Sequence, residues 1–254
     1  MKTPIKMIVT DLDGTLLKTD KTISSRTITA LNRCKQQGIK LAYATGRGGS
    51  ATKVTPPGLF DGSIIANGAY AKAGDTTVYK RIIPYQTIRP LLMACDKRGL
   101  HVSSQLNGMD YANFTISEAW TAVTDFMIVD FSKHDKDAEK IISANLTPED
   151  IAFIEAHLPA DTYLLMTMDG FAMIMHNQAI KSKAIAALAT HWGIAREEIV
   201  AFGDDLNDFD MLTYAGIGIA MSNALGEVKS VADFICQSND DDGIALWLEE
   251  EIFR

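Results

Sequence analysis

The chain has 254 residues, of which 47% are hydrophobic, and its formal net charge is −8. This length allows one large domain or two moderate ones, and the acidic balance argues against a basic face that binds nucleic acid. No apolar stretch approaches the roughly 18 residues of a membrane-spanning helix, so we expect no membrane association.

The first third of the chain alternates short apolar runs with helical patterns. Residues 5–10, 39–44 and 64–65 are predicted strands, and residues 24–37 are a predicted helix that ends at Gly38. Strands and helices that alternate in this way are typical of right-handed crossovers and a parallel sheet.

The middle of the chain has a different pattern. Apolar residues spaced i, i+3, i+4 and i+7 from Ile88 predict an amphipathic helix, and Thr147 to Asp150 resembles a capping box that opens another. Asp-Gly at 169–170, between two apolar runs, predicts an antiparallel hairpin. These features predict an α+β segment over about residues 83–178.

The last third returns to the first pattern. A helix is predicted from about residue 182 to 192, and strands at 199–202, 216–221 and 233–237. The predicted fold class is therefore α/β: a doubly wound, Rossmann-like parallel sheet built from residues 1–82 and 179–254, into which the α+β domain 83–178 is inserted.

Two carboxylates, Asp11 and Asp13, follow the first predicted strand. Side chains two apart in a strand point the same way, so both would project from its carboxyl end, where open α/β sheets place their ligand sites. The alternative is an ordinary Asp-Gly turn at Asp13, which needs no function.

Two further loops follow strands of the same predicted sheet. The segment ATGR, residues 44–47, brings a hydroxyl, a glycine and a guanidinium, all of which suit an oxyanion such as phosphate. The segment GDDLNDFD, residues 203–210, carries four acids: Asp204, Asp205, Asp208 and Asp210. Oxygen donors without His or Cys favour Mg²⁺ over zinc or copper.

Two lysines, Lys181 and Lys183, stand near the start of the helix predicted from about residue 182. A cation there opposes the helix macrodipole, at a cost of about 0.3–1 kcal/mol when exposed, and an unfavourable placement is a weak indication of function. The residue pattern does not choose between the two lysines.

In this order, the motifs resemble those of the haloacid dehalogenase (HAD) superfamily of phosphotransferases. DLDGT (11–15) resembles its first motif, Thr45 its second, Lys181 its third and GDDLND (203–208) its fourth. The spacing resembles that of the Cof-type, subfamily IIB phosphatases, whose cap domain is inserted between the second and third motifs. The segment IIANGAY (64–70) also resembles one typical of that branch. The resemblance spans nearly the whole chain.

The resemblance implies a phosphatase that hydrolyses a small phosphate monoester, with a sugar phosphate as the expected class, through an aspartyl-phosphate intermediate and with Mg²⁺ as cofactor. Asp11 would be the nucleophile and Asp13 the general acid and base. The residues implied to bind the phosphoryl group are Thr45, Gly46, Lys181 and Asn207. Those implied at the metal are Asp11, Asp13 through its backbone carbonyl, Asp204 and Asp208, with Asn207 and Asp208 ordering the surroundings.

The inserted cap is implied to set specificity. Polar residues predicted in its loops are candidates to bind substrate hydroxyls, with ordinary polar turns as the alternative: Gln105, Asn107, Asp110, Tyr111 and Asn113. The expected partner is a small-molecule phosphate ester. The three cysteines are far apart and odd in number, which is typical of reduced thiols, so we expect a cytoplasmic protein. No feature predicts the oligomeric state.

Two alternatives to a hydrolase use the same residues. A phosphosugar mutase or transferase would pass the phosphoryl group from Asp11 to another sugar hydroxyl. A phospho-accepting signalling module would also combine an Asp, a Thr, a Lys and Mg²⁺ on a doubly wound sheet. Such modules are typically half this length and lack an acid two residues after the nucleophile, so Asp13 discriminates against them.

Overall fold

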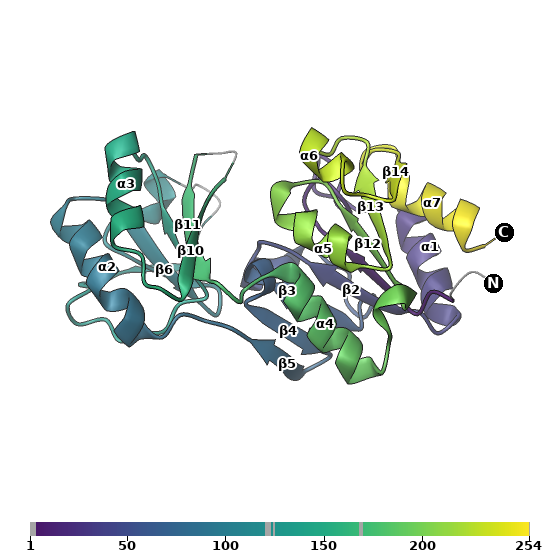
Figure 1. Cartoon of the computed structure of the whole chain (residues 1–254), viewed down its shortest axis with the longest axis horizontal. Coiled ribbons are helices and arrows are strands. Elements are labelled where there is room, and N and C mark those ends of the chain that lie inside the picture. The colour runs from purple at the N-terminus through teal and green to yellow at the C-terminus, as the bar shows by residue number, and fades with distance from the viewer. Residues whose placement is uncertain (1–3, 120–122, 124, 168–169, 254) are drawn as a thin grey trace. The chain divides into compact units, whose positions relative to one another are not determined.

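The computed structural model describes residues 4–119, 123, 125–167 and 170–253. The chain forms two compact units. One consists of residues 1–80 and 180–254, and the other of Arg81–Ala179 (Figure 1). The first unit is therefore built from two separate stretches of sequence, and the second is inserted between them.

The first unit is organised around an eight-stranded sheet of order β14-β13-β12-β1-β2-β3-β4-β5. The strands from β14 to β3 pair in parallel, which confirms the predicted parallel sheet, and β4 and β5 add an antiparallel hairpin that was not predicted. The strands are β1 (Met7–Thr10), β2 (Lys40–Ala44), β3 (Gly62–Ile65), β4 (Tyr70–Ala73), β5 (Thr76–Lys80), β12 (Ile199–Gly203), β13 (Ile217–Met221) and β14 (Phe234–Cys236).

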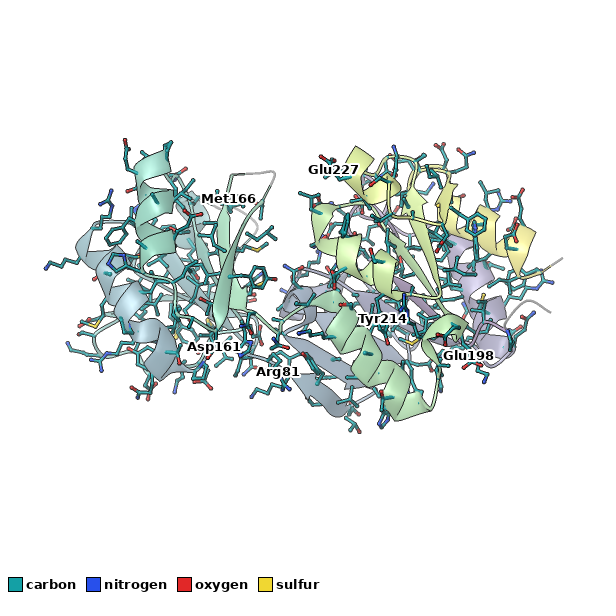
Figure 2. All side chains as sticks on the ribbon, viewed as in Figure 1. Arg81, Asp161, Met166, Glu198, Tyr214 and Glu227 are labelled. Atoms are coloured by element: carbon teal, nitrogen blue, oxygen red, sulfur yellow. The ribbon has the colours of Figure 1, made fainter. Side chains whose placement is uncertain are left out.

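Helices cover both faces of this sheet. Alternation along β1 sends Ile8 into a core with α1 (Ser25–Gln36) and α7 (Gly243–Glu251), whereas Met7 and Val9 join a second core on the opposite face. That second core also contains α4 (Lys181–Trp192), α5 (Phe209–Tyr214) and α6 (Gly226–Lys229). Figure 2 shows side chains filling the space between the sheet and these helices. The result is the doubly wound arrangement predicted from the sequence.

Short 3₁₀ helices punctuate the loops, and three of them adjoin the site described below: η1 (Gly49–Lys53), η2 (Ala66–Gly68) and η5 (Leu206–Asp208). The described residues also form η3 (Ile116–Glu118) and η4 (Arg196–Glu198). Among the described residues, no helix is both long enough and apolar enough to cross a lipid bilayer.

The second unit contains a six-stranded sheet of order β10-β11-β9-β6-β7-β8. All neighbouring strands pair antiparallel except β7 and β8. The strands are β6 (Val102–Leu106), β7 (Met109–Ala112), β8 (Phe126–Ile128), β9 (Lys140–Ser143), β10 (Thr162–Met166) and β11 (Ala172–His176). The antiparallel pairing of β10 with β11 confirms the predicted hairpin, although Asp169 of its turn lies outside the described residues.

Among the described residues of this unit, the α-helices are α2 (Tyr85–Lys97) and α3 (Pro148–Ala156). The apolar positions that predicted α2 from Ile88 onward are buried in the core of the unit. Thr147 and Asp150 form the predicted capping box at the start of α3, where each side chain accepts a hydrogen bond from the other residue's backbone N–H.

Candidate active site

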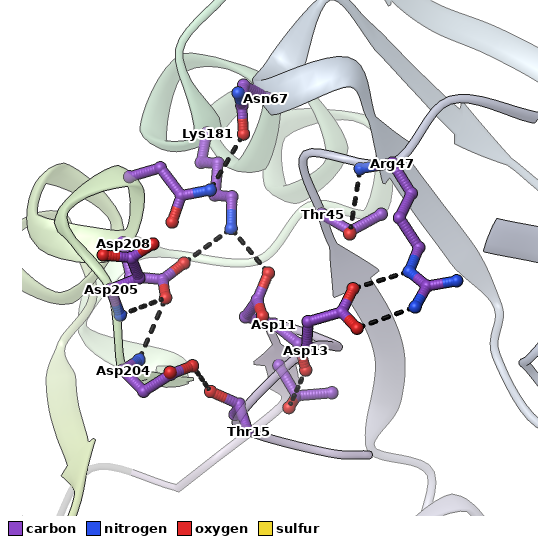
Figure 3. A network of polar contacts seen from close by, with 12 residues as sticks. Asp11, Asp13, Thr15, Thr45, Arg47, Asn67, Lys181, Asp204, Asp205 and Asp208 are labelled. Atoms are coloured by element: carbon purple, nitrogen blue, oxygen red, sulfur yellow. Dashed lines mark hydrogen bonds and ion pairs between the residues drawn. The ribbon is translucent and has the colours of Figure 1, made fainter. Parts of the chain in front are cut away.

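The carboxyl ends of three parallel strands meet at one edge of the first unit's sheet. β1 lies between β12 and β2, and Thr10 is in register with Phe202 on one side and Tyr43 on the other. The loops that follow these strands carry the three sequence motifs, and α4 contributes the fourth. Figure 3 shows the polar network that results.

Asp11 sits at the end of β1 beside a lysine. Lys181 Nζ donates to Asp11 Oδ1 at 2.7 Å and to Asp208 Oδ1 at 2.6 Å, and all three side chains are buried. Burial alone would lower the pKa of Lys181, but the two carboxylates raise it, so the ammonium stays charged. This lysine therefore joins the loop after β1 to the loop after β12.

The first turn of α4 explains which lysine reaches the site. Lys181 is the first residue of the helix and is buried, whereas Lys183 is exposed. The Asp210 carboxylate accepts a hydrogen bond from Ser182 N at 2.8 Å, which places a negative charge at the positive end of the helix. Asp210 thus offsets the unfavourable position of the Lys181 ammonium.

Asp208 organises the loop after β12. Its Oδ2 accepts hydrogen bonds from Asp204 N at 2.9 Å and Asp205 N at 3.1 Å, while its Oδ1 binds Lys181. Both oxygens of Asp208 are thus already used as acceptors within the protein. The Asp205 carboxylate instead accepts from Leu206 N at the start of η5.

Asp204 faces the loop after β1. Thr15 Oγ1 donates to Asp204 Oδ1 at 2.5 Å, and Gly14, at φ +80°, runs so close that an added Cβ would lie 2.2 Å from Asp204 Oδ2. Burial, together with the neighbouring Asp208 and Asp205 carboxylates, raises the pKa of Asp204 to about 7, against the lowering effects of the Thr15 hydrogen bond and of Lys181.

The acidic cluster can hold a cation. Oxygen atoms of Asp11, Asp204 and Asp208 all lie within 4.8 Å of one another. Three carboxylates face a single ammonium, that of Lys181, so two negative charges are left over when all are ionised. Burial, opposed by Lys181, raises the pKa of Asp11 well above its usual range, and the other carboxylates add to this. A divalent cation would balance the excess, and an all-oxygen donor set suits Mg²⁺.

Asp13 has different neighbours, although it lies two residues from Asp11. Arg47 Nε and Nη2 donate to its two carboxylate oxygens at 2.5 and 2.7 Å (Figure 3). Lys21 Nζ donates to Asp13 Oδ1 at 2.8 Å. Partial burial would raise the pKa of Asp13, but the Arg47 and Lys21 hydrogen bonds outweigh it and lower the pKa to about 2.

The loop after β2 is held by a left-handed turn. Ala66 N donates to Arg47 O at 2.8 Å and Asn67 N to Thr45 O at 3.0 Å, while both donor residues adopt positive φ, of 48° and 53°. Such strain is costly for a non-glycine residue and persists where the surroundings enforce it. Asn207 Nδ2 donates to Asn67 Oδ1 at 3.0 Å, which ties this turn to η5.

All the implied site residues of the first unit thus lie at one sheet edge. An added Cβ on Gly46 would lie 3.6 Å from Asn207 Nδ2, so these two residues are also neighbours. Three residues of the network were not predicted to take part, namely Thr15, Lys21 and Asn67. Thr15 and Asn67 stand inside the quoted motifs DLDGT and IIANGAY, which is the signal that could have identified them. Nothing in the sequence marks Lys21.

The residues of the second unit that were candidates to bind substrate hydroxyls have different surroundings. Asn113 is structural, because its side chain bonds Val102 N and Leu100 O. Asp110 is buried and accepts from Ser103 Oγ and Gln105 Nε2. Tyr111 packs against His134, and Asn107 lies in the β6–β7 turn at φ +52°.

Proteins of known sequence and structure resemble this chain along nearly its whole length. A profile of the haloacid dehalogenase-like hydrolases matches residues 8–248. The 5-amino-6-(5-phospho-D-ribitylamino)uracil phosphatase YitU of Bacillus subtilis is 27% identical, over 98% of each chain, and the putative phosphatase YxeH of the same organism is 29% identical, over 96% of this chain and 97% of its own. A solved sugar phosphatase of HAD subclass IIB superimposes with a TM-score of 0.84 at 28% identity, covering 96% of this chain and 98% of its own.

Proposed function

The chain belongs to the haloacid dehalogenase-like hydrolase family and is a phosphoric monoester hydrolase of the subclass IIB type, and from this premise we propose that it hydrolyses a small sugar or sugar-alcohol phosphate through an aspartyl-phosphate on Asp11. The observation that carries the proposal is the pairing of Asp11 with the buried Lys181 beside two further carboxylates. A phosphoryl group needs charge neutralisation and a fixed nucleophile, and this arrangement supplies both.

In the first step, a carboxylate oxygen of Asp11 attacks phosphorus and the bond to the ester oxygen breaks. The leaving oxygen takes a proton from the Asp13 carboxyl group and departs as an alcohol. Lys181 stays between Asp11 and Asp208, where its positive charge offsets the negative charge of the attacking carboxylate.

In the second step, a water oxygen attacks the phosphorus of the aspartyl-phosphate. The water gives a proton to the Asp13 carboxylate, and the bond between phosphorus and Asp11 breaks. The products are inorganic phosphate and the original Asp11 carboxylate, with Asp13 again protonated, so the proton cycle closes. One side chain can serve both steps because it lies two residues from the nucleophile.

Thr45, Gly46 and Asn207 form the rest of the proposed phosphoryl pocket, since they lie on the two loops that flank the end of β1. Mg²⁺ fits the acidic cluster, and we propose Asp11, Asp204 and the Asp13 carbonyl as its ligands. When bound, Mg²⁺ would withdraw negative charge from the phosphoryl oxygens. Asp208 is better suited to holding Lys181 and the loop after β12 in place, because both its oxygens already accept hydrogen bonds from them.

The substrate class is proposed from two relatives of different kinds. YitU is named for a phosphorylated ribityl compound, and the similar solved structure is a sugar phosphatase. Both substrates carry a phosphate on a polyhydroxylated carbon chain. We propose that residues 81–179 select among such esters, and that Gln105 and Asn107, which lie at or beside the β6–β7 turn, are candidates to contact substrate hydroxyls.

The test is phosphate release from a panel of sugar, sugar-alcohol and nucleoside monophosphates, with Mg²⁺ and with EDTA. Native protein is compared with Asp11→Asn and with Asp241→Asn, a surface acid whose carboxylate bonds Ser238. We expect metal-dependent turnover that Asp11→Asn abolishes and Asp241→Asn retains. Turnover that survives Asp11→Asn would refute the aspartyl-phosphate. A sugar bisphosphate or an isomerised sugar phosphate as product would identify the transferase or mutase instead.

A further inference from the structure

The Asp13 carboxylate is held by two cations at once. Arg47 engages both oxygens in a two-pronged ion pair, with Nε on Oδ2 at 2.5 Å and Nη2 on Oδ1 at 2.7 Å. Lys21 Nζ adds a third hydrogen bond to Oδ1 at 2.8 Å. Such a two-pronged ion pair fixes the plane of the carboxylate as well as its distance from the guanidinium.

The backbones of Arg47 and Lys21 are both held by hydrogen bonds. Arg47 O accepts from Ala66 N at 2.8 Å, and Arg47 N donates to Thr45 Oγ1 at 3.1 Å, so the residue is held from both sides. Lys21 lies at φ 66° in a turn closed by its own N–H to Lys18 O at 2.8 Å. The orientation of Asp13 is therefore imposed by Arg47 from the loop after β2 and by Lys21 from a turn eight residues further along the loop after β1.

This geometry suits one of the two proposed steps better than the other. Both Asp13 oxygens accept N–H donors, so the carboxylate is fixed with its acceptor lone pairs in defined directions, which is the geometry that orients a water molecule for proton transfer to it. Receiving a proton from water is what the second step asks of it, whereas the first step asks it to donate. A general base acts only when its oxygen is aimed at the proton it takes, and a displacement of about 1 Å can cost roughly 100-fold in rate.

We propose that Arg47, supported by Lys21, is a positioning residue that holds Asp13 in the orientation used for hydrolysis of the aspartyl-phosphate. The proposal rests on the proposed function, because it presupposes the covalent step on Asp11. It assigns Arg47 to the second half of the reaction rather than to binding of the phosphate ester.

The test uses p-nitrophenyl phosphate, whose leaving group departs without a proton. For this ester kcat/KM reports formation of the aspartyl-phosphate, which does not need Asp13, whereas kcat includes its hydrolysis, which does. In Arg47→Met we expect kcat to fall about 10- to 100-fold and KM to fall by the same factor, so that kcat/KM stays within about threefold. The phosphorylated protein should accumulate and be seen by intact-protein mass spectrometry after an acid quench.

Further variants distinguish the positioning of Asp13 by Arg47 from a general effect of removing a positive charge or of disturbing the fold. Arg47→Lys keeps the charge without the two-pronged ion pair and should show the same pattern at smaller amplitude. Lys21→Met should lower kcat by a smaller factor than Arg47→Met does, because Arg47 still holds Asp13. Lys18→Met is the matched control, since this lysine stands in the same turn but its Nζ bonds Asp240 O and Asp242. In Asp13→Asn, adding Arg47→Met should have no further effect.

Two results would overturn the inference. A fall in kcat/KM with a rise in KM, without accumulation of phosphorylated protein, would show that Arg47 binds the phosphoryl group. A further fall in kcat when Arg47→Met is added to Asp13→Asn would show that Arg47 acts independently of Asp13. Failure of the proposed function looks different: Asp13→Asn itself would then accumulate no phosphorylated protein.

Discussion

Asp204 should make the metal-free protein less stable as the pH rises. Burial raises its pKa from 3.8 to about 7, so the folded protein keeps a proton on this carboxyl that the unfolded chain has already released. Between these two pKa values the folded state binds more protons, and the free energy of unfolding falls with rising pH. The loss begins near pH 4 and is complete above about pH 7.

The size of the effect follows from the shift. The difference between about 7 and 3.8 is about 3 pKa units, and each unit corresponds to 1.36 kcal/mol, which gives a loss on the order of 4 kcal/mol. Mg²⁺ should replace the proton as the balancing charge. At a metal concentration of about 100 times its Kd, binding adds roughly 2.7 kcal/mol to the free energy of unfolding.

Urea unfolding from about pH 4 to about pH 8 in EDTA, followed by circular dichroism, measures this. The comparison is with Asp204→Asn, which keeps an acceptor oxygen for Thr15 but cannot ionise. The variant should equal the native protein near pH 4 and exceed it in stability by several kcal/mol near pH 8, and Mg²⁺ at about 100 times its Kd should narrow that gap by more than half. Asp205→Asn, which neutralises the adjacent acid that caps η5, is the control for the charge change.

Parallel stability curves for the native protein and Asp204→Asn across this range would refute the reasoning. They would mean that the Asp204 carboxylate ionises without cost beside Asp208, so that the loop after β12 opens to water. A stabilisation by Mg²⁺ that persists in Asp204→Asn would separately contradict its place in the cation site.

Three further substitutions, two of them paired with a matched control, test the packing around the site and in the second unit. Lys181→Met leaves two buried carboxylates without their ammonium and should cost about 3–5 kcal/mol in urea unfolding, whereas the exposed Lys183→Met should change stability by less than about 0.5 kcal/mol. Gly14→Ala and Gly38→Ala share a backbone strain of about 1–2 kcal/mol, at φ +80° and +84°, but only Gly14→Ala also presses a methyl group onto a carboxylate, so it should lower both stability and Mg²⁺ affinity more. Thr147→Ala removes the capping box of α3 and should cost about 1 kcal/mol, and a cost near zero would show that the box is not needed there.

Local patterns predicted most of the sheet and the place of the site. The alternation along β1 and the run of strands and helices were enough to bring the loops after β1, β2 and β12 to one edge, because parallel strands end together. Periodicity did not reveal the β4–β5 hairpin. The residues 70–80, YAKAGDTTVYK, alternate too weakly, and the hairpin is stabilised by pairing with β3 and by packing against α4.

The partners of Asp13 and Asp204 were beyond a reading of local pattern. Arg47 stands 34 residues after Asp13, and Thr15 stands 189 residues before Asp204. Neither pairing follows from propensity, because each arises only when two loops are placed side by side by the sheet. The choice of Lys181 over Lys183 was likewise decided by tertiary burial at the first turn of α4.

The contrast between Asp11 and Asp13 explains how one short segment can supply two chemical roles. Asp11 lies among buried carboxylates that raise its pKa, so it depends on Lys181 and on an added cation for its negative charge. Asp13 lies between Arg47 and Lys21, which keep it ionised without a metal. In the metal-free protein these shifts favour a proton on Asp11 and not on Asp13, so Asp11 needs the cation to act as the ionised nucleophile, and Asp13 is arranged to take up the proton in the second step. Since Arg47 comes from the loop after β2 and bonds Asp13 rather than Asp11, changing Arg47 should alter the chemistry of Asp13 while Asp11 keeps its own.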